Sequence, residues 1–156
     1  MGDPAKAAYL DGLKMLARRE LSEAQVRQRL ARKEHDEEAI DAAVTRLREE
    51  RAIDDVRVAE AIARTETSIR RRGRIRVKRR IEQAGIAPAI ARRALDEVFA
   101  AIDDTVLIES ALAKRLRGRE RIADDREFQR LFRFLVGQGF ESDAVMKLLR
   151  PLRSRN

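Results

Sequence analysis

Three copies of a three-helix pattern, spaced about 50 residues apart, constrain this fold more than any other feature of the sequence. An apolar residue near the end of the second helix marks each copy, at Leu30, Ile81 and Leu135. Ile81 follows Leu30 by 51 positions, and Leu135 follows Ile81 by 54. Because stacked helical repeats share a continuous core with their neighbours, we predict an elongated array that curves to the right or to the left.

The helix that closes each copy places the predicted repeat boundaries. In every copy that helix carries apolar residues with the same spacing, as one buried helix face requires. We place the repeats at residues 1–53, 54–102 and 103–156, and the middle repeat is the basic one. The matching apolar residues are Ile40, Val44 and Leu47, then Ala91, Leu95 and Val98, then Val145, Leu149 and Leu152.

Start and stop signals for about nine helices predict an all-α fold. Aromatic residues make up 4% of the chain, and only three prolines and seven glycines interrupt it. Asp3 before a proline, and the capping box formed by Ser22 and Gln25, are typical of helix starts. Gly73 and Gly85 are predicted to end the helices that precede them.

The stretch between Arg70 and Arg80 holds eight basic residues, more than helix stability explains. Cations at the end of one helix suit its macrodipole, whereas Arg74 and Arg76 at the start of the next helix are mildly unfavourable. Charge placed against the dipole indicates an anionic partner; a solvated helix face is the alternative. The candidate binding residues are Arg70, Arg71, Arg72, Arg74, Arg76, Lys78, Arg79 and Arg80.

A second, smaller basic set surrounds a predicted glycine turn further along the chain. Compensation of a helix C-terminus is the alternative explanation of its charge. The chain has a formal net charge of +8, which divides into −1 for residues 1–50, +6 for 51–100 and +3 for 101–156. A nucleic acid, or a protein coated on one, is therefore the expected partner. The second set is Lys114, Arg115, Arg117, Arg119 and Arg121.

The sequence lacks the residues that disulfides, zinc sites and membrane spans require. There is no cysteine, so disulfides and thiolate zinc sites are excluded, and the single histidine, His35, cannot form a histidine metal pair. No apolar run reaches the roughly 20 residues that span a bilayer, and the N-terminus lacks the order of a signal peptide. We expect a soluble, cytoplasmic protein with no membrane partner and no cofactor.

Three aspartate pairs, at residues 54–55, 103–104 and 124–125, raise the possibility of a metal site for phosphodiester cleavage. Each pair directly precedes a helical stretch, and N-capping accounts for all three. Phe128, Phe132, Phe134 and Phe140 have the chemistry to stack bases, but the spacing of Phe128 and Phe132 favours a core role for those two. We therefore predict no catalytic residue, no metal and no enzyme activity.

Short segments at corresponding places in the repeats resemble those of one family. They are Ala17–Ser22 followed by Leu30, then Leu47, Ile53–Asp55 with Ala59, Arg72–Gly73 with Ile81, Gly85–Ile86, and Phe134–Phe140. In order and spacing, from about Ala8 to Leu152, they resemble the RecX family, bacterial regulators of the RecA recombinase. The first repeat departs at Glu34–His35, where the family has Gly and an apolar residue, and Val58 stands where an aromatic is usual.

The resemblance implies a non-enzymatic accessory protein in DNA recombination, repair and the SOS response. RecX-like proteins bind RecA, above all its filament on single-stranded DNA, and lie along the filament groove. They suppress its ATPase, strand-exchange and coprotease activities. By this resemblance we expect the RecA filament as partner, with single-stranded DNA bound weakly or through the filament, and a monomeric protein.

The alternative is a helical DNA-binding protein that acts without RecA. The predicted helix from Ile75 to Ala84 would then be the DNA-binding element. It is rich in Arg and Lys but lacks a set of Asn or Gln residues for adenine contacts, so base readout is unfavourable. Binding to the phosphate backbone without sequence preference fits this alternative better. The third possibility, a metal-dependent nuclease, is least favoured because capping accounts for its carboxylates.

Overall fold

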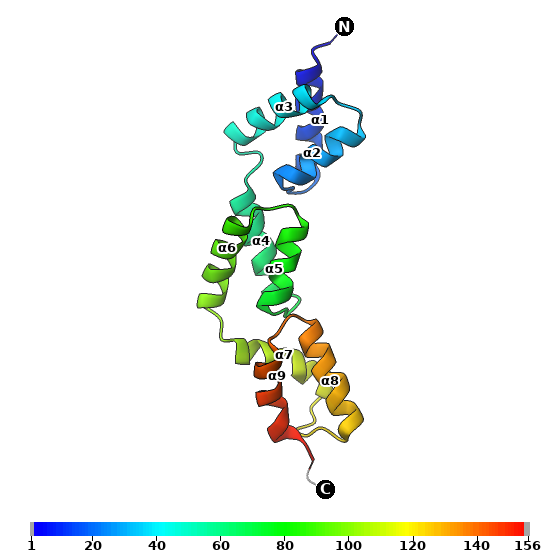
Figure 1. Ribbon diagram of the computed structural model, residues 1–156, viewed down its shortest axis with the longest axis vertical. Coiled ribbons are helices and arrows are strands. Elements are labelled where there is room, and N and C mark those ends of the chain that lie inside the picture. The colour runs from blue at the N-terminus through cyan, green and yellow to red at the C-terminus, as the bar shows by residue number, and fades with distance from the viewer. Residues whose placement is uncertain (1, 155–156) are drawn as a thin grey trace. The chain divides into compact units, whose positions relative to one another are not determined.

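The computed structural model describes residues 2–154, and Figure 1 shows the order of their helices. Nine α-helices and a short 3-10 helix make up the regular structure of this range, which confirms the all-α prediction. They are α1 (Pro4–Arg18), α2 (Glu23–Arg32), α3 (Glu37–Glu49), α4 (Asp55–Ser68), α5 (Arg74–Gln83), α6 (Pro88–Ala100), α7 (Asp104–Leu116), α8 (Asp125–Gly137), α9 (Ser142–Leu149) and η1 (Arg150–Leu152).

Side-chain caps begin many of these helices, as the sequence predicts. The Asp3 carboxylate accepts a hydrogen bond from the Ala5 amide at 3.0 Å. At α2 the capping box is complete, because Gln25 N donates to Ser22 Oγ and Ser22 N donates to Gln25 Oε1. The first aspartate of each pair caps its helix through a backbone amide, which satisfies one of the free N–H groups there. These aspartates are Asp54, Asp103 and Asp124.

Contacts between residues group the described chain into two compact units, with boundaries inside α4 and α5 and within α6. The first unit holds the described residues up to Ala61 together with Ile81–Ala91. The second holds Ile62–Arg80 and the described residues from Arg92 onward. The boundaries of the three repeats, at 53/54 and 102/103, stay a prediction.

The first unit buries an aliphatic core, and a hydrogen bond joins its turn before α2 to its turn after α5. Its core residues are Leu21, Val26, Leu30, Ile40, Val44, Leu47 and Ile53. Buried Ser22, the cap of α2, also donates its hydroxyl to the carbonyl of Ala84 in the turn after α5. Gly85 in that turn has φ +76°, which suits glycine, and a Cβ there would lie 2.5 Å from the Ala24 Cβ. Gly85 ends α5 as predicted.

The turn after α2 has no glycine at the position that takes positive φ. Glu34 takes the left-handed conformation itself, at φ 66°, where a non-glycine residue is strained. The neighbouring His35 lies 2.7 Å from an Asp11 carboxylate oxygen through its Nε2 atom. This bond ties the turn to α1. His35 is therefore a turn residue whose side chain has a structural partner.

The second unit is held by close backbone contact between the turn before α5 and the turn after α8. Gly73 N donates to Gln138 O at 2.8 Å, and Ile75 N donates to Gly139 O at 3.2 Å. A Cβ on Gly73 would lie 2.5 Å from the carbonyl carbon of Gly139 and 2.6 Å from the Phe140 ring. A glycine is therefore required at position 73, because a side chain would overlap the turn after α8.

The prediction that Gly73 ends the preceding helix is wrong. The helix α4 stops at Ser68, and Arg71 takes the left-handed conformation at φ 53°. Gly73 instead directly precedes α5, and its carbonyl accepts a hydrogen bond from Val77 N in the first turn of that helix. The sequence shows that a glycine is needed at this place, but the reason for it is a tertiary contact.

Substituting Gly73 by alanine is expected to destabilise the fold by about 2 kcal/mol, because the new methyl group overlaps backbone atoms of the opposite turn. Gly137→Ala is the matched control, since a Cβ on this helical glycine meets no atom within 4 Å. Urea unfolding followed by circular dichroism at 222 nm measures both. Equal stability of the two variants would show that the turns are not in close contact.

Candidate nucleic-acid interface

Part of each predicted basic set lines a shared surface of the second unit. Residues of the turn after α4 and of the last turns of α7 line one hollow of about 360 Å³. This brings Arg70–Arg72 beside Lys114 and Arg115, more than 40 positions away in the sequence. The lining is Ile69, Arg70, Arg71, Arg72, Ala111, Lys114, Arg115, Phe134 and Gln138.

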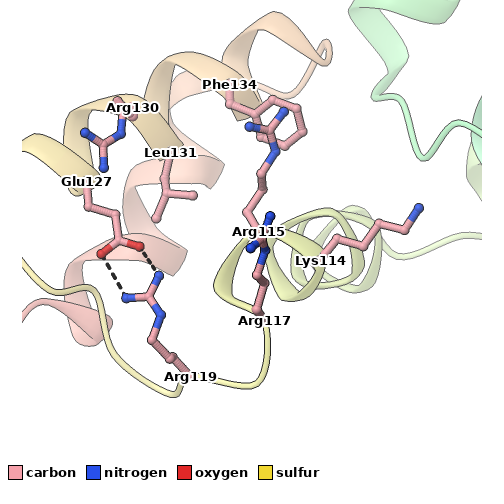
Figure 2. Close-up of a pocket in the computed structure, with 8 residues that line it drawn as sticks. All are labelled: Lys114, Arg115, Arg117, Arg119, Glu127, Arg130, Leu131 and Phe134. Carbon is pink, nitrogen blue, oxygen red and sulfur yellow. Dashed lines mark hydrogen bonds and ion pairs between the residues drawn. The ribbon is translucent and has the colours of Figure 1, made fainter.

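A second hollow, of about 740 Å³, continues from the same residues toward the start of α8 (Figure 2). Its lining is Lys114, Arg115, Arg117, Arg119, Glu127, Arg130, Leu131 and Phe134. The two hollows share Lys114, Arg115 and Phe134. We call the residues that line either hollow the basic groove. Its cations outnumber its single carboxylate, Glu127, so it attracts anions.

The end of α7 presents its cations because its apolar residues anchor it. Leu112 and Leu116 are buried in the core of the second unit, so Lys114 and Arg115 face outward. Arg117 and Gly118 both take positive φ, at 51° and 85°, and turn the chain sharply after the helix. Cations suit a helix C-terminus, so the alternative explanation of this set accounts for their presence there. Compensation of the helix C-terminus does not explain why these cations line the same hollow as the turn after α4.

Among the phenylalanines of α8 and its following turn, Phe134 is the one that lines the groove. Phe128 and Phe140 are buried in the core of the unit, and Phe132 packs against that core, so the predicted core roles of Phe128 and Phe132 are confirmed. Phe134 is half-buried, and the Arg115 guanidinium carbon lies over its ring, 3.8 Å from the centroid. Figure 2 shows the guanidinium in front of the ring. Such a cation–π contact holds a flexible side chain in place.

Two of the predicted binding residues lie beside one buried carboxylate, that of Glu66. Arg72 pairs with Glu66 at 2.6 Å, and the Glu66 side chain is only 5% exposed. Arg70 lies 3.8 Å from the same carboxylate. Removing a partner from a buried ion pair leaves an uncompensated charge, which is strongly destabilising. Arg72 therefore has a structural role in holding the turn that presents its neighbours.

Glu127, which lines the groove near the start of α8, is also held in an internal ion pair. It forms a two-point contact with the Arg119 guanidinium, drawn as dashed lines in Figure 2, and accepts a hydrogen bond from Ala123 N at 2.8 Å. The hydrogen bond from Arg119, followed by that from Ala123, lowers the pKa of Glu127 to about 2. The Glu127 carboxylate therefore stays ionised and bound to Arg119 and Ala123, and it leaves the other cations of the groove available to an external anion.

Three further predicted residues make contacts within the unit. Arg76 donates to Gly137 O at 3.1 Å and to Gln138 Oε1 at 2.9 Å, which clamps α5 to the turn after α8. Burial, then the charge of Arg72, lowers the pKa of Arg76 from its ordinary value. Arg74 pairs with Asp96, and Arg121 donates to Arg153 O at 3.3 Å. None of these three lines the basic groove.

The cations best placed for an external anion are Arg71, Lys114 and Arg117. Across residues 2–154 none of the three has an ion pair or a side-chain hydrogen bond. Lys78, Arg79 and Arg80 are exposed on α5 but lie outside the groove.

Sequence reasoning missed Arg130, and it named Phe134 only as one of four phenylalanines with the chemistry to stack bases. Both lie on α8, one helical turn apart, so they share a face. That spacing was a usable signal. The sequence does not show, however, that the end of α7 lies beside this face of α8.

Comparisons with known proteins agree with the fold and the sequence pattern. Residues 8–47 match the family model for the first three-helix domain of RecX. The regulatory protein RecX of Halorhodospira halophila is 32% identical over 92% of this chain and 87% of its own length. That of Syntrophotalea carbinolica is 30% identical over 92% of this chain and 95% of its own. The crystal structure of RecX from Lactobacillus salivarius covers 97% of this chain and 98% of its own, with a TM-score of 0.75 at 21% identity.

Among the helices of residues 2–154, none has the length and apolar character that crossing a membrane demands.

Neutralising Glu127 is expected to cost stability in a pH-dependent way. Because its pKa falls from 4.5 to about 2 on folding, its contribution is full above pH 4.5 and is lost as the pH falls toward 2. Glu127→Gln should therefore melt below the unsubstituted protein at pH 7, and the gap should close between pH 4.5 and 2. Thermal melts across this range measure the gap.

Glu120→Gln is the control for this measurement, since Glu120 is exposed on the same loop. Its melting temperature should follow that of the unsubstituted protein at every pH. A gap for Glu127→Gln that stays constant with pH would contradict the assigned ion pair.

Proposed function

Because this chain belongs to the RecX family of regulatory proteins, we propose that it is a non-enzymatic regulator of the RecA recombinase. It binds the RecA filament on single-stranded DNA and inhibits its ATPase, strand-exchange and coprotease activities. It does so as a monomer in the cytoplasm, where RecA acts in DNA recombination, repair and the SOS response.

The basic groove is the observation that carries this proposal. It gathers cations from α7, α8 and the turn after α4 around one hollow surface, and its single carboxylate is already bound. A filament of protein on single-stranded DNA offers a regular row of phosphates. Cations without internal partners gain most from such a ligand, since they have no ion pair to break.

The lack of a catalytic constellation in the sequence fits a regulator that acts by contact. The first aspartate of each pair is used as a helix cap. Asp55, the second of its pair, accepts a hydrogen bond from Glu23 N at 2.9 Å. These roles leave the carboxylates of residues 54–55 engaged in holding the first unit together.

A second candidate function, DNA binding without RecA, is favoured by the same groove. Its cations would meet the phosphates of free DNA as readily as those of a filament. Exposed Arg79 and Arg80 on α5 would add to backbone binding without sequence preference. The two functions differ in the amount of protein that each requires.

Titration of the protein into a RecA ATPase assay stimulated by single-stranded DNA distinguishes the two. A regulator is expected to abolish ATP hydrolysis at ratios far below those that coat the DNA, because one molecule affects many RecA subunits of a filament. Binding to the same DNA without RecA, at matched salt, runs in parallel. Loss of ATPase that tracks saturation of the DNA would mean competition for DNA and would overturn the proposal.

A further inference from the structure

We propose that the basic groove is a site for single-stranded nucleic acid in which one unpaired base stacks on the Arg115 guanidinium. This inference rests on the proposed function and deepens it, because it names which component of the filament this surface meets and through which atoms. The ligand is recognised by two features together, a base with an open face and the phosphates on either side of it.

The stacking platform consists of Arg115 and Phe134. The guanidinium carbon lies 3.8 Å from the ring centroid, and the ring packs against the core of the unit. The ring covers one face of the guanidinium, while Arg115 itself is exposed and lines the groove. Arginine planes held in this way stack nucleobases as aromatic rings do.

The surroundings of this platform suit phosphates. Lys114 lies before Arg115 on α7, Arg117 lies in the turn directly after the helix, and Arg71 lines the hollow from the turn after α4. Within residues 2–154 these three cations make no ion pair. The nearby carboxylate, Glu127, is held by Arg119 and Ala123. A base on the platform thus has unpaired positive charge on both sides for its flanking phosphates.

Single-stranded nucleic acid fits these features better than the other anions do. In a duplex the base faces are already stacked, and exposing one requires unpairing. An acidic protein surface would satisfy the cations but would leave the platform unused. Sequence-tolerant stacking beside a basic track is the usual way in which proteins hold single strands.

The test uses the full chain with fluorescent oligonucleotides and compares three probes of equal length: oligothymidine, an abasic strand and a duplex. Fluorescence anisotropy at matched salt gives the affinities. Arg115→Lys keeps the charge but removes the planar group, and Phe134→Leu keeps the apolar bulk but removes the ring. Arg133→Gln is the control, an exposed cation on α8 that does not line the groove.

The unsubstituted protein is expected to bind oligothymidine about tenfold more tightly than the abasic strand. Arg115→Lys should lose that difference while its affinity for the abasic strand and its salt dependence stay the same. A 2-aminopurine base within the strand should change its emission on binding to the unsubstituted protein and not to Arg115→Lys. Arg133→Gln should keep the full preference for oligothymidine. Because Arg115 is exposed, its variant tests the inference even if Phe134→Leu is unstable.

Equal affinity for oligothymidine and the abasic strand would overturn the inference and leave a backbone-only site. Filament binding without any affinity for free single strands would overturn it in favour of an acidic protein surface. Inhibition of RecA ATPase by the unsubstituted protein is measured beside these assays. If inhibition is absent but the base preference holds, the proposed function fails and this site stands; if inhibition is present without base preference, the reverse is true.

Discussion

Backbone contact between two glycine turns is the constraint on which the second unit depends. Gly73 and Gly139 approach so closely that neither position has space for a side chain. Arg76 clamps the same contact from α5 through the carbonyl of Gly137. Because the turn after α4 is held there, Arg71 faces the end of α7, and the basic groove exists only while this contact holds. We therefore expect a variant of this turn to change both the stability of the second unit and the proposed binding.

The first unit contains a corresponding contact, which supports the proposed three-repeat organisation. The turn before α2 meets the turn after α5 through Ser22 and Ala84, as the turn before α5 meets the turn after α8. In terms of the predicted repeats, each contact joins the first turn of one copy to the second turn of the next. Gly85 occupies the place in one contact that Gly139 occupies in the other, and both have positive φ. Close packing of this kind explains why a weak sequence repeat is accompanied by a regular spacing.

Local signals in the sequence were sufficient for the helices and insufficient for the site. Caps such as Ser22 act within a few residues, so their partners can be predicted from spacing alone. The role of Gly73 was misassigned because its true partner lies 66 positions later, at Gly139. The convergence of Arg71 with Lys114 could not be predicted for the same reason. The basic character of both segments was evident, but which cations are free depends on tertiary contacts, as the clamped Arg76 demonstrates.

We propose that the basic groove is the surface through which this protein binds the RecA filament. The most direct measurement is cosedimentation with RecA filaments formed on single-stranded DNA, at fixed salt, for two charge-matched variants. Arg71→Glu/Lys114→Glu reverses two groove cations, whereas Arg92→Glu/Arg93→Glu reverses two exposed cations of α6 outside the groove. We expect the groove variant to lose filament binding by roughly tenfold or more while the α6 variant retains it. Equal losses in the two variants, or full binding by the groove variant, would contradict the proposal.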